Sequence, residues 1–240
     1  MNKIALALAA AMLLAACGDK QSTAEKAPAK TPTAASIEGG DGESAAPAIV
    51  VPPPPPSKVD ELDWPATSTY AKISTSMGDF TVALYPDQAP KSVANFLDYA
   101  KSGFYDRLII HRVVPGFVIQ GGGYSRYFQP RPTKGNVPYE GDNGLGNYRT
   151  TIAMARTDDP DSATSQWFVN LRDNNSKLDH FVNDLGPRYG YTVFGRVVEG
   201  MDVVDKIGAL PTGAGGPFES EVPDPLVIIN RVDPVDKPAQ

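Results

Sequence analysis

The sequence predicts a mainly β fold, a domain of short strands with only two helices. Between residues 70 and 232, several stretches alternate apolar and polar side chains with the two-residue period of a strand, and turn residues separate them. Two other stretches repeat apolar residues at helical spacing. From about residue 60 to residue 235 the chain is long enough to bury one conventional core. Periodicity alone allows either a β-sandwich or a closed barrel.

A β-hairpin is predicted at the start of this domain, where residues 70–76 and 80–85 alternate around the turn at residues 77–79. Residues 143–149 and 212–223 are expected to be loops. Six further strand candidates bring the total to eight, and they lie at residues 108–114, 117–120, 151–155, 166–170, 191–198 and 226–232.

Both helix candidates are amphipathic. The first begins near Pro90, a residue that suits the first helical turn, and ends before Gly103. The second covers residues 200–207. Their apolar residues at helical spacing are Val93, Phe96, Leu97 and Ala100 in the first and Met201, Val204 and Ile207 in the second.

Composition and charge exclude several classes of protein. The chain is 41% hydrophobic and 21% charged, as globular proteins are, and its net charge of -6 argues against a nucleic-acid partner. The single cysteine, Cys17, leaves the domain without an intramolecular disulfide. His111 and His180 are the only histidines, so we expect no metal site and no cofactor.

The N-terminus has the layout of a secretory signal. Residues 1–16 combine one positive charge with an apolar stretch too short to cross a bilayer comfortably. The run Leu14-Ala15-Ala16 before Cys17 resembles the lipobox of bacterial lipoproteins, which implies lipidation of Cys17 and a membrane partner. Gly18 resembles the residue found in lipoproteins sent to the outer membrane, facing the periplasm. The alternative is an ordinary signal peptide that contains a cysteine.

A tether is predicted at residues 17–66, because Ala, Pro, Ser, Thr, Lys and Glu dominate there and cannot bury enough apolar surface to fold. It includes the proline run at residues 52–56. Two alternatives remain for this run: a ligand for aromatic grooves, or a segment that occupies the proline site of its own domain.

Residues 111–122 hold the most informative motif, His-Arg-Val-Val-Pro-Gly-Phe-Val-Ile-Gln-Gly-Gly. Arg112, Phe117 and Gln120 stand among β-branched residues that favour strands, which suits a rigid binding cleft. Without further context, a buried strand with Arg112 on its rim as an ion-pair partner explains the run better.

Together with residues 151–155 and 165–168, this run resembles the cyclophilin family of peptidyl-prolyl cis/trans isomerases, in particular its bacterial periplasmic members. The likeness extends from about residue 70 to residue 232. It implies a closed eight-stranded antiparallel β-barrel capped by two helices, with a domain at residues 67–235 and a short tail at residues 236–240.

The resemblance also implies the residues of the site. Arg112, Phe117 and Gln120 match the catalytic positions, with Arg112 as the donor to the substrate. The matching substrate-binding positions are Val118, Met154, Ala155, Arg156, Gln166, Phe168, Leu178 and Tyr191. Two positions depart from the best-known eukaryotic pattern: Lys177 replaces a tryptophan, which puts tight cyclosporin binding in doubt, and Tyr191 replaces a histidine.

The chemistry needs no nucleophile, because rotation about an X-Pro bond breaks no covalent bond. As the amide twists, the prolyl nitrogen regains its lone pair, so a fixed donor such as the Arg112 guanidinium stabilises the transition state selectively. We expect a monomeric isomerase that acts on proline-containing, unfolded polypeptides of the cell envelope. A chaperone or peptide-binding module with the same groove, and an inactive structural lipoprotein, are the alternatives.

Overall fold

The computed structural model of the chain describes residues 50–238. The predicted signal peptide, the lipidation at Cys17 and most of the predicted tether lie outside these residues. Within residues 50–238, no helix is long and apolar enough to cross a membrane.

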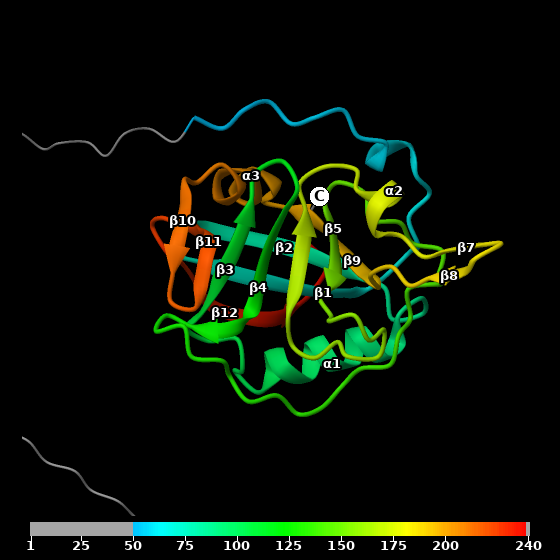
Figure 1. The fold of residues 1–240 in the computed structure, drawn as a ribbon, viewed down its shortest axis with the longest axis horizontal. Helices are drawn as coiled ribbons and strands as arrows, with labels where there is room; N and C mark the ends of the chain where they lie inside the picture. The colour runs from blue at the N-terminus through cyan, green and yellow to red at the C-terminus, as the bar shows by residue number, and fades with distance from the viewer. Residues whose placement is uncertain (1–49, 239–240) are drawn as a thin grey trace, which may run out of the picture. The chain divides into compact units, whose positions relative to one another are not determined.

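Eight antiparallel strands close into a barrel (Figure 1). Each strand covers one of the eight predicted stretches to within a few residues, so the predicted fold class is confirmed. In their order around the barrel, the strands are β1 (Thr69–Thr75), β12 (Val227–Val235), β3 (Leu108–Val114), β4 (Val118–Ser125), β6 (Trp167–Asn170), β5 (Thr151–Met154), β9 (Val193–Glu199) and β2 (Gly78–Leu84).

The two predicted helices lie on opposite sides of the barrel in Figure 1. In α1 (Pro90–Lys101) the predicted apolar residues Val93, Phe96 and Ala100 are buried. In α3 (Met201–Gly208) Val204 and Ile207 are buried. Two short helices were not predicted: η1 (Val59–Glu61) and α2 (Asn175–Leu178).

Side-chain alternation divides the buried residues of the sheet into two clusters. Ile119, Ile152 and Val169 belong to the main core. Their neighbours along the same strands form a small second cluster that contains Val118, Ala153, Phe168 and Val193. Because successive residues of a strand point to opposite faces, the second cluster lies on the other face of β4, β6, β5 and β9. An apolar surface is thus built on the sheet, away from the main core.

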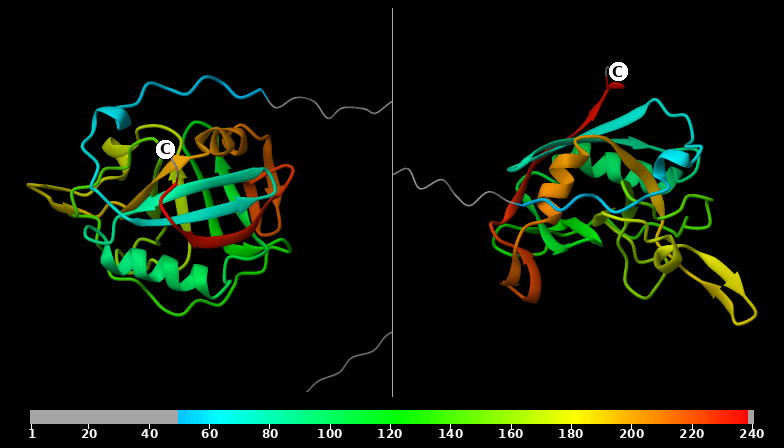
Figure 2. Two further views of the ribbon diagram at one scale, coloured as in Figure 1. Left: turned by 180° about the vertical axis from the view of Figure 1, so that it is seen from behind. Right: turned by 90° about the horizontal axis from the view of Figure 1, so that it is seen from above.

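The prediction of a loop at residues 212–223 was wrong. The segment forms a hairpin of β10 (Thr212–Gly215) and β11 (Phe218–Pro223), beside β3 in Figure 1. The turn depends on Gly216, whose φ of 53° is readily adopted only by glycine. A second hairpin, β7 (Phe181–Asn183) with β8 (Gly186–Arg188), extends away from the barrel (Figure 2).

Residues 57–66, at the end of the predicted tether, lie against the domain. The hydroxyl of Ser57 donates to Asp173 at 2.6 Å, and Val59 is buried. Trp64 stacks on Tyr85 with ring centroids 6.0 Å apart and an interplanar angle of 10°. One valine and one tryptophan supply the apolar surface that the rest of the tether lacks. The ordered domain therefore begins about ten residues before the predicted boundary.

Candidate functional site

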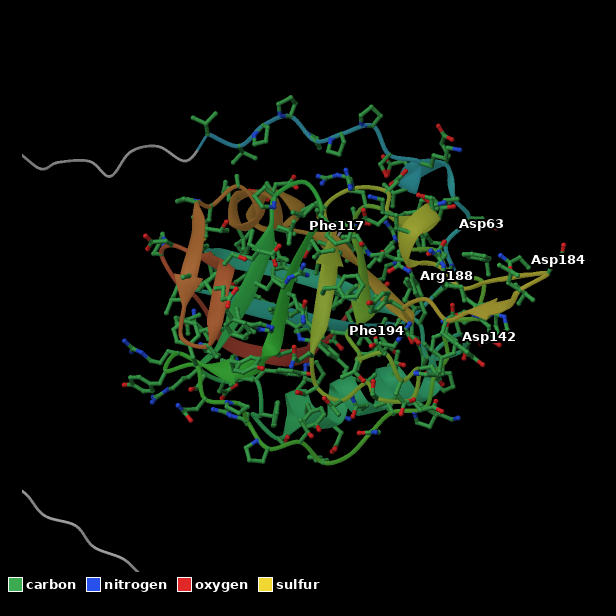
Figure 3. All side chains as sticks on the ribbon, in the orientation of Figure 1. Asp63, Phe117, Asp142, Asp184, Arg188 and Phe194 are labelled. Carbon is green, nitrogen blue, oxygen red and sulfur yellow. The ribbon has the colours of Figure 1, made fainter. Side chains whose placement is uncertain are left out.

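A cavity of about 200 Å³ lies over the second cluster, on the outer face of the sheet. Apolar side chains form most of its wall, and Arg112, Gln120 and Arg156 bring polar groups to it. Figure 3 labels Phe117, which lies in the turn between β3 and β4 at one end of this surface. The cavity is lined by Arg112, Phe117, Val118, Gln120, Ala155, Arg156, Phe168, Leu178 and Tyr191.

These nine residues are all among the eleven predicted for the site. The tenth, Gln166, accepts a hydrogen bond from the side chain of Gln120 at 3.1 Å and so adjoins the cavity. Strand pairing explains the assembly, because Gln120 on β4 lies opposite both Arg112 on β3 and Phe168 on β6.

Met154 was predicted in the wall of the pocket, but it does not line the cavity. It is 2% exposed and belongs to the main core, whereas its neighbour Ala155 packs with the second cluster. Alternation along the strand places one of the two residues on each face, and Met154 faces away from the cavity.

The guanidinium of Arg112 is held by two acceptors. Its Nε donates to the Glu221 carboxylate at 2.6 Å, and its Nη1 donates to Oε1 of Gln120 at 3.4 Å. Glu221 lies on β11, within the stretch predicted to be a loop, and sequence reasoning missed it. A local signal existed for the hairpin, because the Gly215-Gly216 pair lies between two short stretches, but it does not identify Arg112 as the partner of Glu221.

Aromatic and cationic contacts define the opposite wall of the cavity. The rings of Phe168 and Tyr191 meet edge to face, with centroids 5.4 Å apart. The guanidinium carbon of Arg156 lies 4.8 Å from the centre of the Tyr191 ring, and its Nε donates to the carbonyl of Gly190 at 2.8 Å. Tyr191 therefore fills the position where the family histidine was expected, and it presents a ring to the cavity.

Three buried asparagines are joined by hydrogen bonds behind the cavity, and two of them donate to backbone carbonyls of residues in its walls. Asn174 donates to the carbonyl of Phe117 at 3.0 Å and to Asn170 at 2.8 Å. Asn147 donates to the carbonyls of Leu178 and Tyr191, both at 3.2 Å. Asn147 lies in the loop predicted at residues 143–149, and the prediction of a loop did not include its fully buried side chain.

His111 lies beneath the site and is 3% exposed. Its ring stacks on Phe218 with centroids 5.5 Å apart and contacts Tyr124 at 4.9 Å. Burial, followed by the positive charge of Arg112, lowers the pKa of His111 to about 4. The imidazole is therefore neutral at neutral pH and is enclosed by aromatic rings, which fits the structural role expected for it.

Two other cavities are less suited to an X-Pro segment. A hollow of about 400 Å³ lies between residues 62–64 and residues 141–148, and the carboxylates of Asp63, Asp142 and Asp179 line it. A third, of about 200 Å³, is lined by residues 50–55 together with Pro115 and Gly116. Most of the proline run thus lines a cavity that is separate from the Arg112 cavity.

A closed barrel that carries a guanidinium beside an apolar cavity on its outer face defines the cyclophilin type of protein. Residues 70–233 match the family described as "Cyclophilin type peptidyl-prolyl cis-trans isomerase/CLD". The chain belongs to this family.

Named relatives and solved structures agree with this assignment. Peptidyl-prolyl cis-trans isomerase A of Dickeya dadantii is 49% identical over 162 residues, which cover 68% of this chain and 83% of the relative. Peptidyl-prolyl cis-trans isomerase B of Escherichia coli is 47% identical over 161 residues, 66% of this chain and 94% of the relative. A cyclophilin type isomerase of Cryptosporidium parvum shares the fold, with a TM-score of 0.58 and 24% identity over 72% of this chain and 100% of its own. The predicted enzyme class, a peptidyl-prolyl cis-trans isomerase, is confirmed.

Proposed function

We propose that this protein accelerates cis/trans isomerisation of X-Pro bonds in unfolded or flexible polypeptides of the bacterial cell envelope, while it is anchored to a membrane through lipidated Cys17. The observation that carries the catalytic part is the Arg112 guanidinium, held at the edge of an apolar cavity wide enough for a proline ring. A related structure of the Cryptosporidium parvum protein was determined in the presence of the dipeptide Ala-Pro, which supports a proline-containing ligand.

Catalysis follows from stronger binding of the twisted amide than of either planar form. The barrier to rotation is about 20 kcal/mol, and each ~1.4 kcal/mol of preferential binding gives a tenfold rate. Phe117, Phe168 and Leu178 enclose the proline ring in this proposal, and Gln120 bonds the substrate backbone. As rotation proceeds, an N–H of Arg112 donates to the prolyl nitrogen, whose lone pair is available only in the twisted state.

Replacing Arg112 tests the proposal. In the full chain, Arg112→Ala should lower the cis-to-trans rate of a proline peptide by about 100-fold, the effect of losing one donor to a transition state. The affinity for the peptide should change much less, and Arg126→Ala, which removes a guanidinium outside the cavity, is the matched control. Equal rates in the parent and Arg112→Ala would contradict the catalytic role.

A binding module that holds proline segments without turnover is the second candidate, and the β7–β8 hairpin favours it. Val182 and Leu185 are 70% and 96% exposed on this projection, whose tip carries Asp184 in Figure 3. Exposed apolar side chains next to a peptide cleft suit the capture of unfolded chains. Negligible turnover in both the parent and Arg112→Ala, with peptide affinity retained, would leave this function alone.

The anchor is proposed from the sequence, on the lipobox-like run before Cys17. Metabolic labelling with a fatty acid should modify the parent and not Cys17→Ser, and fractionation should place only the parent in a membrane. Labelling of neither protein would leave the ordinary signal peptide as the interpretation. Separation of inner from outer membrane would test the assignment based on Gly18.

A further inference from the structure

Glu221 reaches Arg112 from a hairpin that carries none of the predicted site residues. The carboxylate and the Arg112 Nε are 2.6 Å apart, and the two side chains are 40% and 35% exposed. An ion pair in such contact with water contributes little to stability. The contact with Glu221 therefore matters for the orientation of the guanidinium rather than for stability.

The contacts of Arg112 fix the plane of its head group. Glu221 takes Nε and Gln120 takes Nη1, while Nη2 has no protein acceptor within residues 50–238. A guanidinium is a rigid planar fork, so holding two of its nitrogens sets the direction of the third. Nη2 is then available for a substrate.

The hairpin holds Glu221 firmly in place. Phe218 on the same strand stacks on the buried His111, and Val222 is 5% exposed. Glu221 itself has a φ of 67°, in the left-handed region that residues other than glycine rarely adopt. A strained residue that is kept in place beside a site is a reason to look for a functional role.

We propose that Glu221 is a positioning residue, which holds the Arg112 guanidinium ready to donate to the prolyl nitrogen. This inference rests on the proposed function, in which Arg112 is that donor. A donor fixed before the substrate binds needs no reorganisation as the amide twists, whereas a free arginine side chain must be ordered in each turnover.

Two substitutions separate positioning from folding, because glycine suits the backbone at this residue and glutamine keeps an acceptor for Nε. In the full chain, Glu221→Gly should lower kcat about threefold to tenfold, as expected for an arginine that is no longer held in place, with peptide affinity unchanged. Glu221→Gln should restore most of the rate. The Nε–H resonance of Arg112 should exchange slowly with water in the parent and in Glu221→Gln, and fast in Glu221→Gly.

Glu219→Ala is the matched control, because it removes the same charge from an exposed position on the same strand. An unchanged kcat in Glu221→Gly would overturn the inference, and so would a higher one, which would mean that the carboxylate competes with the substrate. Arg112→Ala in the same assay distinguishes failure of the positioning role from failure of the proposed function. If Arg112→Ala lowers the rate and Glu221→Gly does not, only the positioning role is contradicted. Parental rate in Arg112→Ala contradicts the catalytic assignment itself.

Discussion

His111 connects the site to the stability of the domain. Its folded-state pKa of about 4 lies below the ordinary value of 6.5, because burial between Tyr124 and Phe218 disfavours the imidazolium. A histidine whose pKa is depressed on folding binds its proton preferentially in the unfolded state. Its contribution to stability is therefore complete above pH 6.5 and is lost as the pH falls toward 4.

We predict a loss on the order of 2–3 kcal/mol of unfolding free energy from this residue between pH 7 and pH 4. Urea titrations at several pH values should show a shallower acid decline in His111→Phe, which keeps a ring against Phe218 and cannot titrate. Parallel declines in the two proteins would contradict the shifted pKa. The isomerisation rate, in contrast, should stay nearly flat between pH 6 and pH 8, because a guanidinium keeps its proton in this range and the pKa of His111 lies well below it.

At the scale of elements, the asparagine network joins the β6–α2 segment to the walls of the cavity. Asn147 is fully buried, and its amide donates to the carboxylate of Asp179 at 2.9 Å as well as to the carbonyls of Leu178 and Tyr191. Loss of the amide would leave three part-buried acceptors without this partner, and each of them would then bear part of its desolvation cost. The network thus couples packing to substrate binding.

Asn147→Ala should therefore destabilise the domain by about 1–3 kcal/mol and weaken peptide binding more than it lowers kcat. This is the reverse of the pattern expected for Arg112→Ala, because in the proposed function Leu178 helps to enclose the proline ring while Arg112 acts on the twisted amide. Asn175→Ala is the control, since its side chain makes no hydrogen bond to residues 50–238. An unchanged peptide affinity in Asn147→Ala would show that the network serves folding alone.

The sequence was sufficient for the elements that alternation and helical spacing define. Strand β3 coincides with its predicted stretch because β-branched residues and strand pairing act together there, whereas β4 continues beyond its predicted end through the glycines at 121–123. The Met154 assignment failed because a motif names residues without giving the face to which each points. The partners of Glu221 and Asn147 could not be predicted from local patterns, since each side chain contacts residues distant in sequence that only the closed barrel brings near.

At the scale of the whole molecule, residues 57–66 belong to the fold rather than to the tether. The indole of Trp64 donates to the carbonyl of Val59 at 2.8 Å, and the guanidinium carbon of Arg196 lies 5.4 Å from the centre of its ring. Arg196 also donates to the hydroxyl of Tyr85 at 3.1 Å, so Trp64 packs against Arg196 in the middle of β9 and against Tyr85, the residue after β2. Burying Val59 and Trp64 stabilises the barrel by about 2–3 kcal/mol.

A fragment that starts at residue 67, the predicted domain boundary, should consequently melt about 5–10 °C below one that starts at residue 50. Trp64→Ala in the longer fragment should reproduce most of this difference, while Val50→Ala, at a position that is 85% exposed, should not change the melting temperature. Both fragments keep every residue that lines the Arg112 cavity, so their isomerisation rates at 25 °C should agree. Equal melting temperatures of the two fragments would mean that residues 57–66 do not stabilise the domain and belong to the tether. A lower isomerisation rate in the shorter fragment would instead mean that residues 57–66 support the site. The contact that would explain such a result is the hydrogen bond of Ser57 to Asp173, because the next residue, Asn174, holds the carbonyl of Phe117.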